Sequence, residues 1–388
     1  MSEAGFTVAP AIPADGLLLH IGVHKTGTTA IQAALADARP DLETHGVRYP
    51  GKLQAHHRAA LAVLGRPWGW NTRGGAVLDT EHFDKLAKRA GAHTGRVVIS
   101  SEFFCEADEH TARSVVERLG GDRVRVVVTL RNLGRLLSSS WQQYLKYGLT
   151  TPYEKWLEDV FAHPGAARIS PTFWKRHDHG AVLSRWVSAV GAENVNVLVL
   201  EDVPRDAMFT SFAQLMGVSP EVLTSRMDLT SNRSMTAAEA ELLVQLNARV
   251  KNEMQWNDYV RLVRRGVALG MVEGREPDPS EPRLVTPEWA LDAAAGHGAA
   301  AVATIKALGV NVYGDLDLLA VRVPSPDGDQ ESQSTTTQVP IAAAVEALAS
   351  VIAASHDEAS SRQLAGRLLR QTRKQGIGSL FQKDDESR

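Results

Sequence analysis

The stretch that decides the fold is LLLHIGVHKTGTTAIQ, residues 17–32. Its first residues, Leu17 to Leu19, are apolar and predict a buried strand. The glycines and threonines that follow predict a loop that opens a helix. Free backbone N–H groups at such a helix start attract anions without help from side chains. The stretch is therefore predicted to bind a phosphate group.

The spacing of this loop is close to that of nucleotide-binding loops of the form GxxxxGK[ST]. Gly22 and Gly27 have the right separation, but Thr28 stands where that pattern has lysine, and Lys25 lies three residues earlier. In nucleoside triphosphatases the lysine serves the β- and γ-phosphates, and an aspartate on another strand holds magnesium. Here the next strong strand, VRVVVTL over residues 124–130, ends in Arg131 instead of a carboxylate. A second anion site without a metal is predicted there, because open α/β sheets bind ligands at the carboxyl ends of their strands.

Two motifs resemble those of sulfotransferases that use 3′-phosphoadenosine 5′-phosphosulfate (PAPS). They are KTGTT after the first strand and RNLGRLLSS after the later one. The resemblance covers about the first two-thirds of the chain, and Ala30, in place of the tryptophan of the animal enzymes, favours the bacterial sulfotransferase-like or glycan-type branches. It implies PAPS as co-substrate, its bisphosphate PAP as product, and no metal. The residues assigned to the 5′-phosphosulfate are Lys25, Thr26, Gly27, Thr28 and Thr29, and those assigned to the 3′-phosphate are Arg131 and Ser139.

A third strand, RVVISS over residues 96–101, ends at Glu102. Animal cytosolic sulfotransferases carry a histidine base near this point, whereas glycan- and tyrosine-directed relatives use a glutamate. The resemblance therefore implies Glu102 as the base and Lys25 as the group that stabilises the leaving phosphate. A partly buried carboxylate at a strand end is expected to have a raised pKa. The alternative is that Glu102 only flanks the following turn.

Four further residues are weaker candidates. His57 starts a helix-like segment and is placed near the acceptor by resemblance to bacterial relatives. Trp70 in RPWGWN, together with Trp68, is a candidate for an acceptor pocket, although aromatic side chains in such loops commonly only pack. Arg233 in SNRS resembles a late basic segment that returns to the 3′-phosphate. The same segment also predicts a helix start, with Thr236 and Glu239 forming a capping box.

Strands separated by helical stretches predict an α/β fold with a central, mainly parallel sheet flanked by helices. The resemblance implies the P-loop-type three-layer version, with a helical C-terminal extension. The predicted organisation is a flexible N-terminal tail (1–16), a catalytic domain (17–273), a helical extension (274–323), a linker (324–338) and a C-terminal helical segment (339–388). That last segment is expected to dock on the core, form a homodimer or bind a partner.

Composition agrees with a cytoplasmic enzyme. The 388 residues carry a net charge of −3, which disfavours nucleic acid as the main partner. The single cysteine, Cys105, excludes an internal disulfide and indicates a reducing compartment. The start of the chain has no apolar stretch long enough for a signal peptide or membrane anchor.

The expected activity is sulfuryl transfer to a hydroxyl, or to an amine, of a glycan, lipid or secondary metabolite. The alternatives are a P-loop small-molecule kinase and a nucleotide-binding scaffold protein without catalytic activity. Magnesium-dependent ATP binding would favour the kinase, and donor binding without turnover would favour the scaffold. The sequence does not identify the acceptor or the way in which adenine is held.

Overall fold

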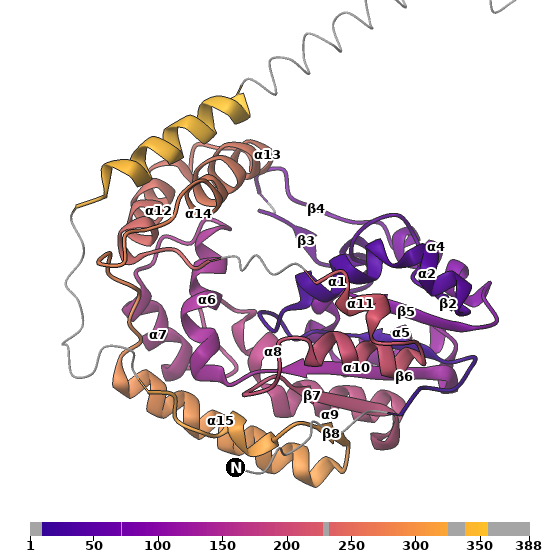
Figure 1. Ribbon diagram of the computed structural model, residues 1–388. Helices are drawn as coiled ribbons and strands as arrows, with labels where there is room; N and C mark the ends of the chain where they lie inside the picture. Colours follow the sequence, from indigo (N-terminus) through magenta and orange to yellow (C-terminus); the bar gives the residue numbers. More distant parts are fainter. Residues whose placement is uncertain (1–9, 71, 228–232, 325–337, 356–388) are drawn as a thin grey trace, which may run out of the picture.

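The computed structural model describes residues 10–70, 72–227, 233–324 and 338–355. Within them, six parallel strands form a central sheet in the order β2-β5-β1-β6-β7-β8 (Figure 1). The strands are β1 (Leu17–His20), β2 (Val47–Arg48), β5 (Arg96–Ser100), β6 (Val124–Leu130), β7 (Val195–Val199) and β8 (Asn311–Tyr313). A separate antiparallel pair joins β3 (Pro67–Trp68) to β4 (Ala76–Val77). The prediction of an α/β fold with a central parallel sheet is confirmed.

The inner strands are apolar along their whole length because both faces of the sheet are covered. Leu17 and Leu19 of β1 pack on one face, and Leu18 packs on the other. All three side chains are fully buried. Parallel sheets are characteristically covered on both faces, and their strands show continuous apolar runs for that reason. This is why the apolar runs in the sequence located β1, β5 and β6 correctly.

Two layers of helices enclose the sheet. One face is covered by α1 (Thr28–Asp37), α2 (Arg39–Thr44), α10 (Ala207–Met216) and α11 (Glu221–Thr224). The other face is covered by α3 (His57–Val63), α4 (Glu81–Gly91), α5 (Glu109–Arg118), α9 (His179–Val190) and the second half of α15 (Glu288–Leu308).

A helical part with its own apolar core adjoins the carboxyl ends of the strands (Figure 1). It contains α6 (Leu133–Leu145), α7 (Tyr153–Ala162), α8 (Phe173–His177), α12 (Ala237–Val250), α13 (Trp256–Asp258), a π-helix η4 (Tyr259–Leu269) and α14 (Gly270–Gly274). The first half of α15 also packs on this core. Short 3-10 turns connect several elements, namely η1 (Glu102–Glu106), η2 (Gly121–Arg123), η3 (Ala192–Asn194) and η5 (Leu316–Leu319).

Strand β1 marks the point where the order of the sheet changes direction. The chain proceeds from β1 to β2 and β5 on one side, and then crosses to β6, β7 and β8 on the other. In open α/β sheets, ligands bind outside the carboxyl ends of the strands at such a switch point. The loops after β1, β5 and β6 are therefore the natural place for a binding site.

The two chain ends differ from the predicted organisation. Of the predicted flexible tail, residues 10–16 are described, and Ile12 is buried with its N–H donating to the Leu215 carbonyl at 2.9 Å. The predicted helical extension contains the expected helix α15, but it also supplies β8, the edge strand beside β7. This strand has only three residues, too few for a recognisable period. Most of the predicted linker, residues 325–337, lies outside the described residues.

A helix over residues 341–355 follows, and it packs on the helical part. Ala343 and Ala347 contact Val267 and Met271 in a small apolar cluster. This contact agrees with the expectation that the C-terminal segment docks on the core. Residues 356–388 lie outside the described residues. Within the described ranges, no helix is long and apolar enough to cross a membrane.

Candidate functional site

The loop between β1 and α1 is fixed tightly to its neighbours. The side chain of Thr26 is buried, donates to the Val23 carbonyl at 2.8 Å, and lies 2.5 Å from the Thr129 hydroxyl of β6. Gly22 has a φ of 99°, and a Cβ atom there would lie 2.9 Å from the Cα and Cβ atoms of Glu102. Glycine is therefore required at position 22, because this backbone conformation and this close approach exclude a side chain.

The helix that follows begins at the surface of the site. Gly27 is the N-cap of α1 with a φ of 86°, and no side chain caps the helix start. Gly27 and Thr29 are exposed, whereas Thr28 is buried. The first N–H groups of α1 are thus oriented toward an open surface, as an anion site at a helix start requires.

Lys25 lies in this loop with a φ of 68°, in the left-handed region, and its Nζ donates to Gln143 Oε1 at 3.0 Å. The pKa of Lys25 is lowered to about 8, first by burial and then by the charge of Lys146. The charges of Arg176 and Arg264 act in the same direction, and the charge of Glu102 opposes them.

Lys25 is thus part of a cluster of cations contributed by different helices. Lys146 follows α6, and Arg264 of η4 lies over the Tyr147 ring at 4.8 Å. The Nε atom of Arg264 is buried and has no hydrogen-bond partner among the described residues. Within the same part of the chain, no ion pair neutralises Lys25, Lys146 or Arg264. The cluster carries positive charge that a bound anion would balance.

Glu102 begins the turn η1, two residues after the end of β5, and β5 pairs with β1, the strand before Lys25. Its Oε2 accepts a hydrogen bond from Gln32 Nε2 at 3.0 Å and lies 3.6 Å from His57 Nδ1. Burial raises the pKa of this carboxyl, but the charges of His57 and His24 and the hydrogen bond from Gln32 lower it more. The net effect is a pKa below the ordinary value, so the expectation of a raised pKa was wrong. The neighbours of Glu102 stabilise its ionised form more than burial destabilises it.

Arg131 directly follows β6, on the other side of β1 from Glu102. Its side chain is 44% exposed, and its Nε lies 3.7 Å from Oε1 of the buried Glu201. Ser139 lies about two turns into α6, and its hydroxyl donates to the Leu136 carbonyl at 3.1 Å. The start of α6 is capped by Asn132, whose side chain accepts from the Gly134 N–H at 2.9 Å.

Arg233 is engaged in an ion-pair network. Its Nη1 and Nη2 donate to the two oxygens of the buried Glu239 at 2.7 and 2.9 Å, and its Nε donates to the Arg275 carbonyl at 3.2 Å. Arg275 also pairs with Glu239 through Nε at 2.8 Å. Thr236 and Glu239 form the expected capping box. These contacts occupy the guanidinium with structural partners, although residues 228–232 just before it lie outside the described residues.

We therefore expect Arg233→Ala to act mainly on stability. Removing one partner of a buried ion pair costs about 3–5 kcal/mol where the other charge is left unpaired. The cost here is smaller, because Glu239 keeps its ion pair with Arg275 at 2.8 Å. The melting temperature should fall, and the affinity for adenosine 3′,5′-bisphosphate at 20 °C should change less than threefold if the variant is still folded, because surface charges beyond contact range contribute about 1 kcal/mol or less. Exposed Arg249, paired with Glu253 at 2.6 Å, provides the matched control variant Arg249→Ala. A large loss of bisphosphate affinity without a change in melting temperature would instead assign Arg233 to the ligand.

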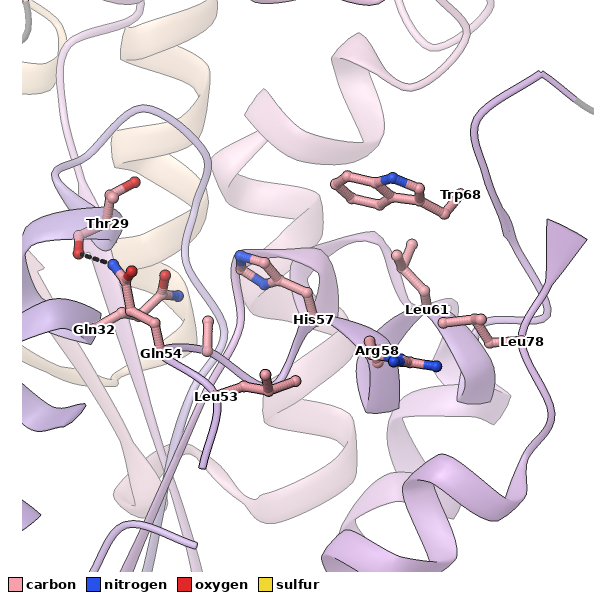
Figure 2. A pocket seen from close by; sticks show the side chains of 10 residues that line it. Thr29, Gln32, Leu53, Gln54, His57, Arg58, Leu61, Trp68 and Leu78 are labelled. Carbon is pink, nitrogen blue, oxygen red and sulfur yellow. Dashed lines mark hydrogen bonds between the residues drawn. The ribbon is translucent and has the colours of Figure 1, made fainter. Parts of the chain in front are cut away.

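A cavity of about 530 Å³ is lined by Gln32 and His57, the two side chains that approach Glu102 (Figure 2). His57, at the start of α3, lies in its wall, and its Nδ1 is 2.9 Å from the Ser101 hydroxyl. Trp68 of β3 lines the cavity, whereas Trp70 is not among the lining residues. The Trp70 ring packs against Tyr259, with 4.6 Å between ring centroids, and its Nε1 donates to the Tyr147 carbonyl at 3.0 Å. In this structure Trp70 has the packing role, and Trp68 is the tryptophan that faces the cavity.

The sequence analysis did not find several residues that shape this site. They lie on helices and turns between the motifs, namely Gln32, Gln143, Lys146, Arg176, Glu201 and Arg264. Of these residues, only Glu201 lies just after a strand, two residues beyond the end of β7, so its position in the sequence could have indicated it. Within the described residues, no group of three or more metal-binding side chains is present.

No family model matches the chain. No curated protein matches it either. Among solved structures, the chain is similar to a sulfotransferase from Alicyclobacillus acidocaldarius, with 16% sequence identity and a TM-score of 0.41. The match covers 65% of this chain and 99% of that one.

Proposed function

We propose that this protein is a sulfotransferase that moves a sulfuryl group from PAPS to an acceptor hydroxyl and releases adenosine 3′,5′-bisphosphate. One observation carries the proposal. Lys25, Glu102 and Arg131 lie after β1, β5 and β6, which are three adjacent strands of the sheet. This arrangement supports the proposal, in which Lys25 and Arg131 each bind one phosphate of the donor and Glu102 serves the acceptor.

The charges of the site support an anionic donor. The start of α1 is exposed and uncapped, and within the described residues no carboxylate forms an ion pair with Lys25, Lys146 or Arg264, whereas Arg176 pairs with Glu106 at 2.8 Å. Repulsion among these cations contributes to the lowered pKa of Lys25. A phosphosulfate bound by Lys25 and the N–H groups of residues 26–29 would relieve this repulsion. The buried Thr26 side chain holds the loop in shape, so its backbone and not its hydroxyl is available to the ligand.

The second phosphate of the donor is assigned to Arg131 and Ser139. Arg131 is exposed beside Glu201, and the pairing distance of 3.7 Å is longer than a hydrogen bond. The guanidinium therefore keeps donors for a phosphate, which it binds well through paired N–H groups. The role of Ser139 rests on the sequence motif.

The reaction we propose needs two groups from the protein. The acceptor oxygen attacks sulfur in line, a new S–O bond forms, and the bond from sulfur to the 5′-phosphate oxygen breaks. Glu102 takes the acceptor proton, and the negative charge that develops on the departing phosphate is stabilised by Lys25 and the loop N–H groups. Orientation of the two substrates supplies much of the remaining rate enhancement.

The test is calorimetric binding of adenosine 3′,5′-bisphosphate beside ADP and magnesium-ATP. We expect a clear preference for the bisphosphate. In Arg131→Ala that affinity should fall about 10- to 100-fold, the cost of losing charge-assisted hydrogen bonds. Arg135→Ala is the matched control, because Arg135 is 49% exposed and lies 3.0 Å from the same Glu201 carboxylate. Preference for magnesium-ATP, or no nucleotide binding, would favour the kinase or the scaffold protein instead.

A further inference from the structure

The cavity beside His57 has a mainly apolar wall surface, although half of its lining residues are polar. It is formed by the loop before α3, by α3 itself and by the β3–β4 segment, next to the start of α1 (Figure 2). Its volume of about 530 Å³ lies in the range of small-molecule sites. The lining residues are Thr29, Gln32, Leu53, Gln54, Ala55, His57, Arg58, Leu61, Trp68 and Leu78.

The cavity reaches the proposed base through two of its wall residues. Gln32 Nε2 and His57 Nδ1 both approach the same oxygen of Glu102, Oε2, at 3.0 and 3.6 Å. A molecule in the cavity that contacts Gln32 and His57 is therefore separated from the Glu102 carboxylate only by these two side chains. His57 Nδ1 is directed to Ser101 and Glu102, and its other ring nitrogen has no partner within the described part of the chain.

Two of the polar side chains in the wall make hydrogen bonds within the protein. Gln54 Nε2 donates to the Thr29 carbonyl at 3.1 Å, and Gln32 Nε2 also donates to the Ser100 hydroxyl at 3.1 Å. Arg58 is exposed and lies 3.2 Å from His82. Sugar hydroxyls that faced the apolar side chains of the wall would lose hydrogen bonds to water without regaining them.

Neighbouring aromatic rings contact Trp68, the largest apolar side chain of the wall. The Trp68 ring meets Phe103 and Tyr147 edge to face, with centroid distances of 5.8 and 6.0 Å. Leu61 is 2% exposed, so it forms the floor, whereas Leu53 is 59% exposed and lies at the rim. An apolar ligand would bind favourably against this wall, because binding removes apolar surface of both from water.

We infer that this cavity binds the acceptor, and that the acceptor carries its hydroxyl on an apolar skeleton and not on a sugar. This inference rests on the proposed function for the transfer itself. It places the acceptor on the β5 side of β1 and the 3′-phosphate on the β6 side, so the two substrates approach Lys25 from opposite sides. Of the acceptor classes predicted from the sequence, this inference favours lipids and apolar metabolites over glycans.

The experiment uses the full chain and the probes 1-butanol, 1-hexanol, 1-octanol and glucose. Transfer of labelled sulfate from PAPS gives a KM for each alcohol, and saturation-transfer NMR measures alcohol binding without turnover. We expect KM to fall by up to about fourfold per added methylene group, the value for complete burial of that group. Glucose should be a poor acceptor.

Two variants and one control connect the effect to the cavity. Leu53→Asn and Trp68→Ala should weaken the dependence on chain length, while calorimetric affinity for the bisphosphate stays unchanged. Leu348→Asn is the matched control, because Leu348 is 65% exposed on a helix outside the cavity. Since Leu53 is also mostly exposed, its substitution should not unfold the protein.

The outcomes separate this inference from the proposed function. A KM that does not change with chain length, or a preference for glucose, would overturn the apolar acceptor even if the bisphosphate binds. Loss of bisphosphate affinity in Leu53→Asn or Trp68→Ala would show that the donor occupies the cavity and would also overturn it. Absence of bisphosphate binding by the unmodified chain would refute the proposed function, and alcohol binding by NMR would then still decide whether the cavity takes apolar hydroxyl compounds.

Discussion

Glu102→Gln is expected to lower the turnover number about 10²- to 10⁴-fold, the usual contribution of a general base, while the bisphosphate binds as before. Glutamine keeps the size of the side chain and can still accept the hydrogen bond that Gln32 donates at 3.0 Å. It cannot take a proton from the acceptor. The measurement is the rate of sulfate transfer with both substrates saturating, together with calorimetry of the bisphosphate.

The control variant is Glu43→Gln, which removes an exposed carboxylate that pairs with Arg48 at 2.9 Å. It should leave both the rate and the affinity unchanged. A melting curve shows whether Glu102→Gln is folded, and Glu102→Asp, which retains a carboxylate, should recover part of the lost rate. Full activity in Glu102→Gln would eliminate this residue as the base.

The pH profile gives an independent check on the same residue. The base must be ionised, and the charges of His57 and His24 with the hydrogen bond from Gln32 lower the pKa of Glu102 below its ordinary value of 4.5. The rate should therefore fall only when the pH drops below about 4.5, as Glu102 becomes protonated. A fall already at pH 6–7 would be typical of a histidine and would point to His57, which faces the cavity.

The inner strands were predictable because each of them is a continuous run of mainly apolar residues, which is typical of a buried parallel strand. For the same reason the chemical groups that directly follow those strands could be found, since the carboxyl ends of neighbouring parallel strands meet at one edge. Glu102 and Arg131 were predicted as site residues in this way, whereas Lys25 was predicted from the spacing of the loop after β1. Strand β8 was missed because its three residues carry no period and their pairing with β7 depends on the whole fold.

The environment of each group was harder to predict than its position. The pKa of Glu102 was expected to rise with burial, but three neighbours from other segments reverse the effect. Likewise, Trp68 and Trp70 are two residues apart and chemically identical, and only the tertiary packing decides that Trp68 lines the cavity. Such effects depend on contacts between residues far apart in sequence, which no local pattern records.

Lys25→Ala is expected to lower the rate of transfer about 10²- to 10³-fold, the cost of removing one charge-stabilising group from a transition state. It should also weaken bisphosphate binding, because Lys25 is the cation of the loop after β1. Lys155→Ala, at an exposed position on α7, is the control and should change neither. Normal activity in Lys25→Ala would refute the role of this loop in the transfer.

The pH dependence of binding identifies the same lysine more directly. The pKa of Lys25 is lowered to about 8 in the free protein. Below this pH the ammonium is charged and ready for an anion, whereas above it the lysine must take up a proton before it can pair with the phosphate. Bisphosphate affinity should therefore decrease between pH 7 and 9, by at most about tenfold per pH unit above the pKa of Lys25. Lys25→Arg keeps its charge throughout this range, so its affinity should stay constant. An equal decrease in Lys25→Arg would mean that another group titrates, and that the anion does not bind at Lys25.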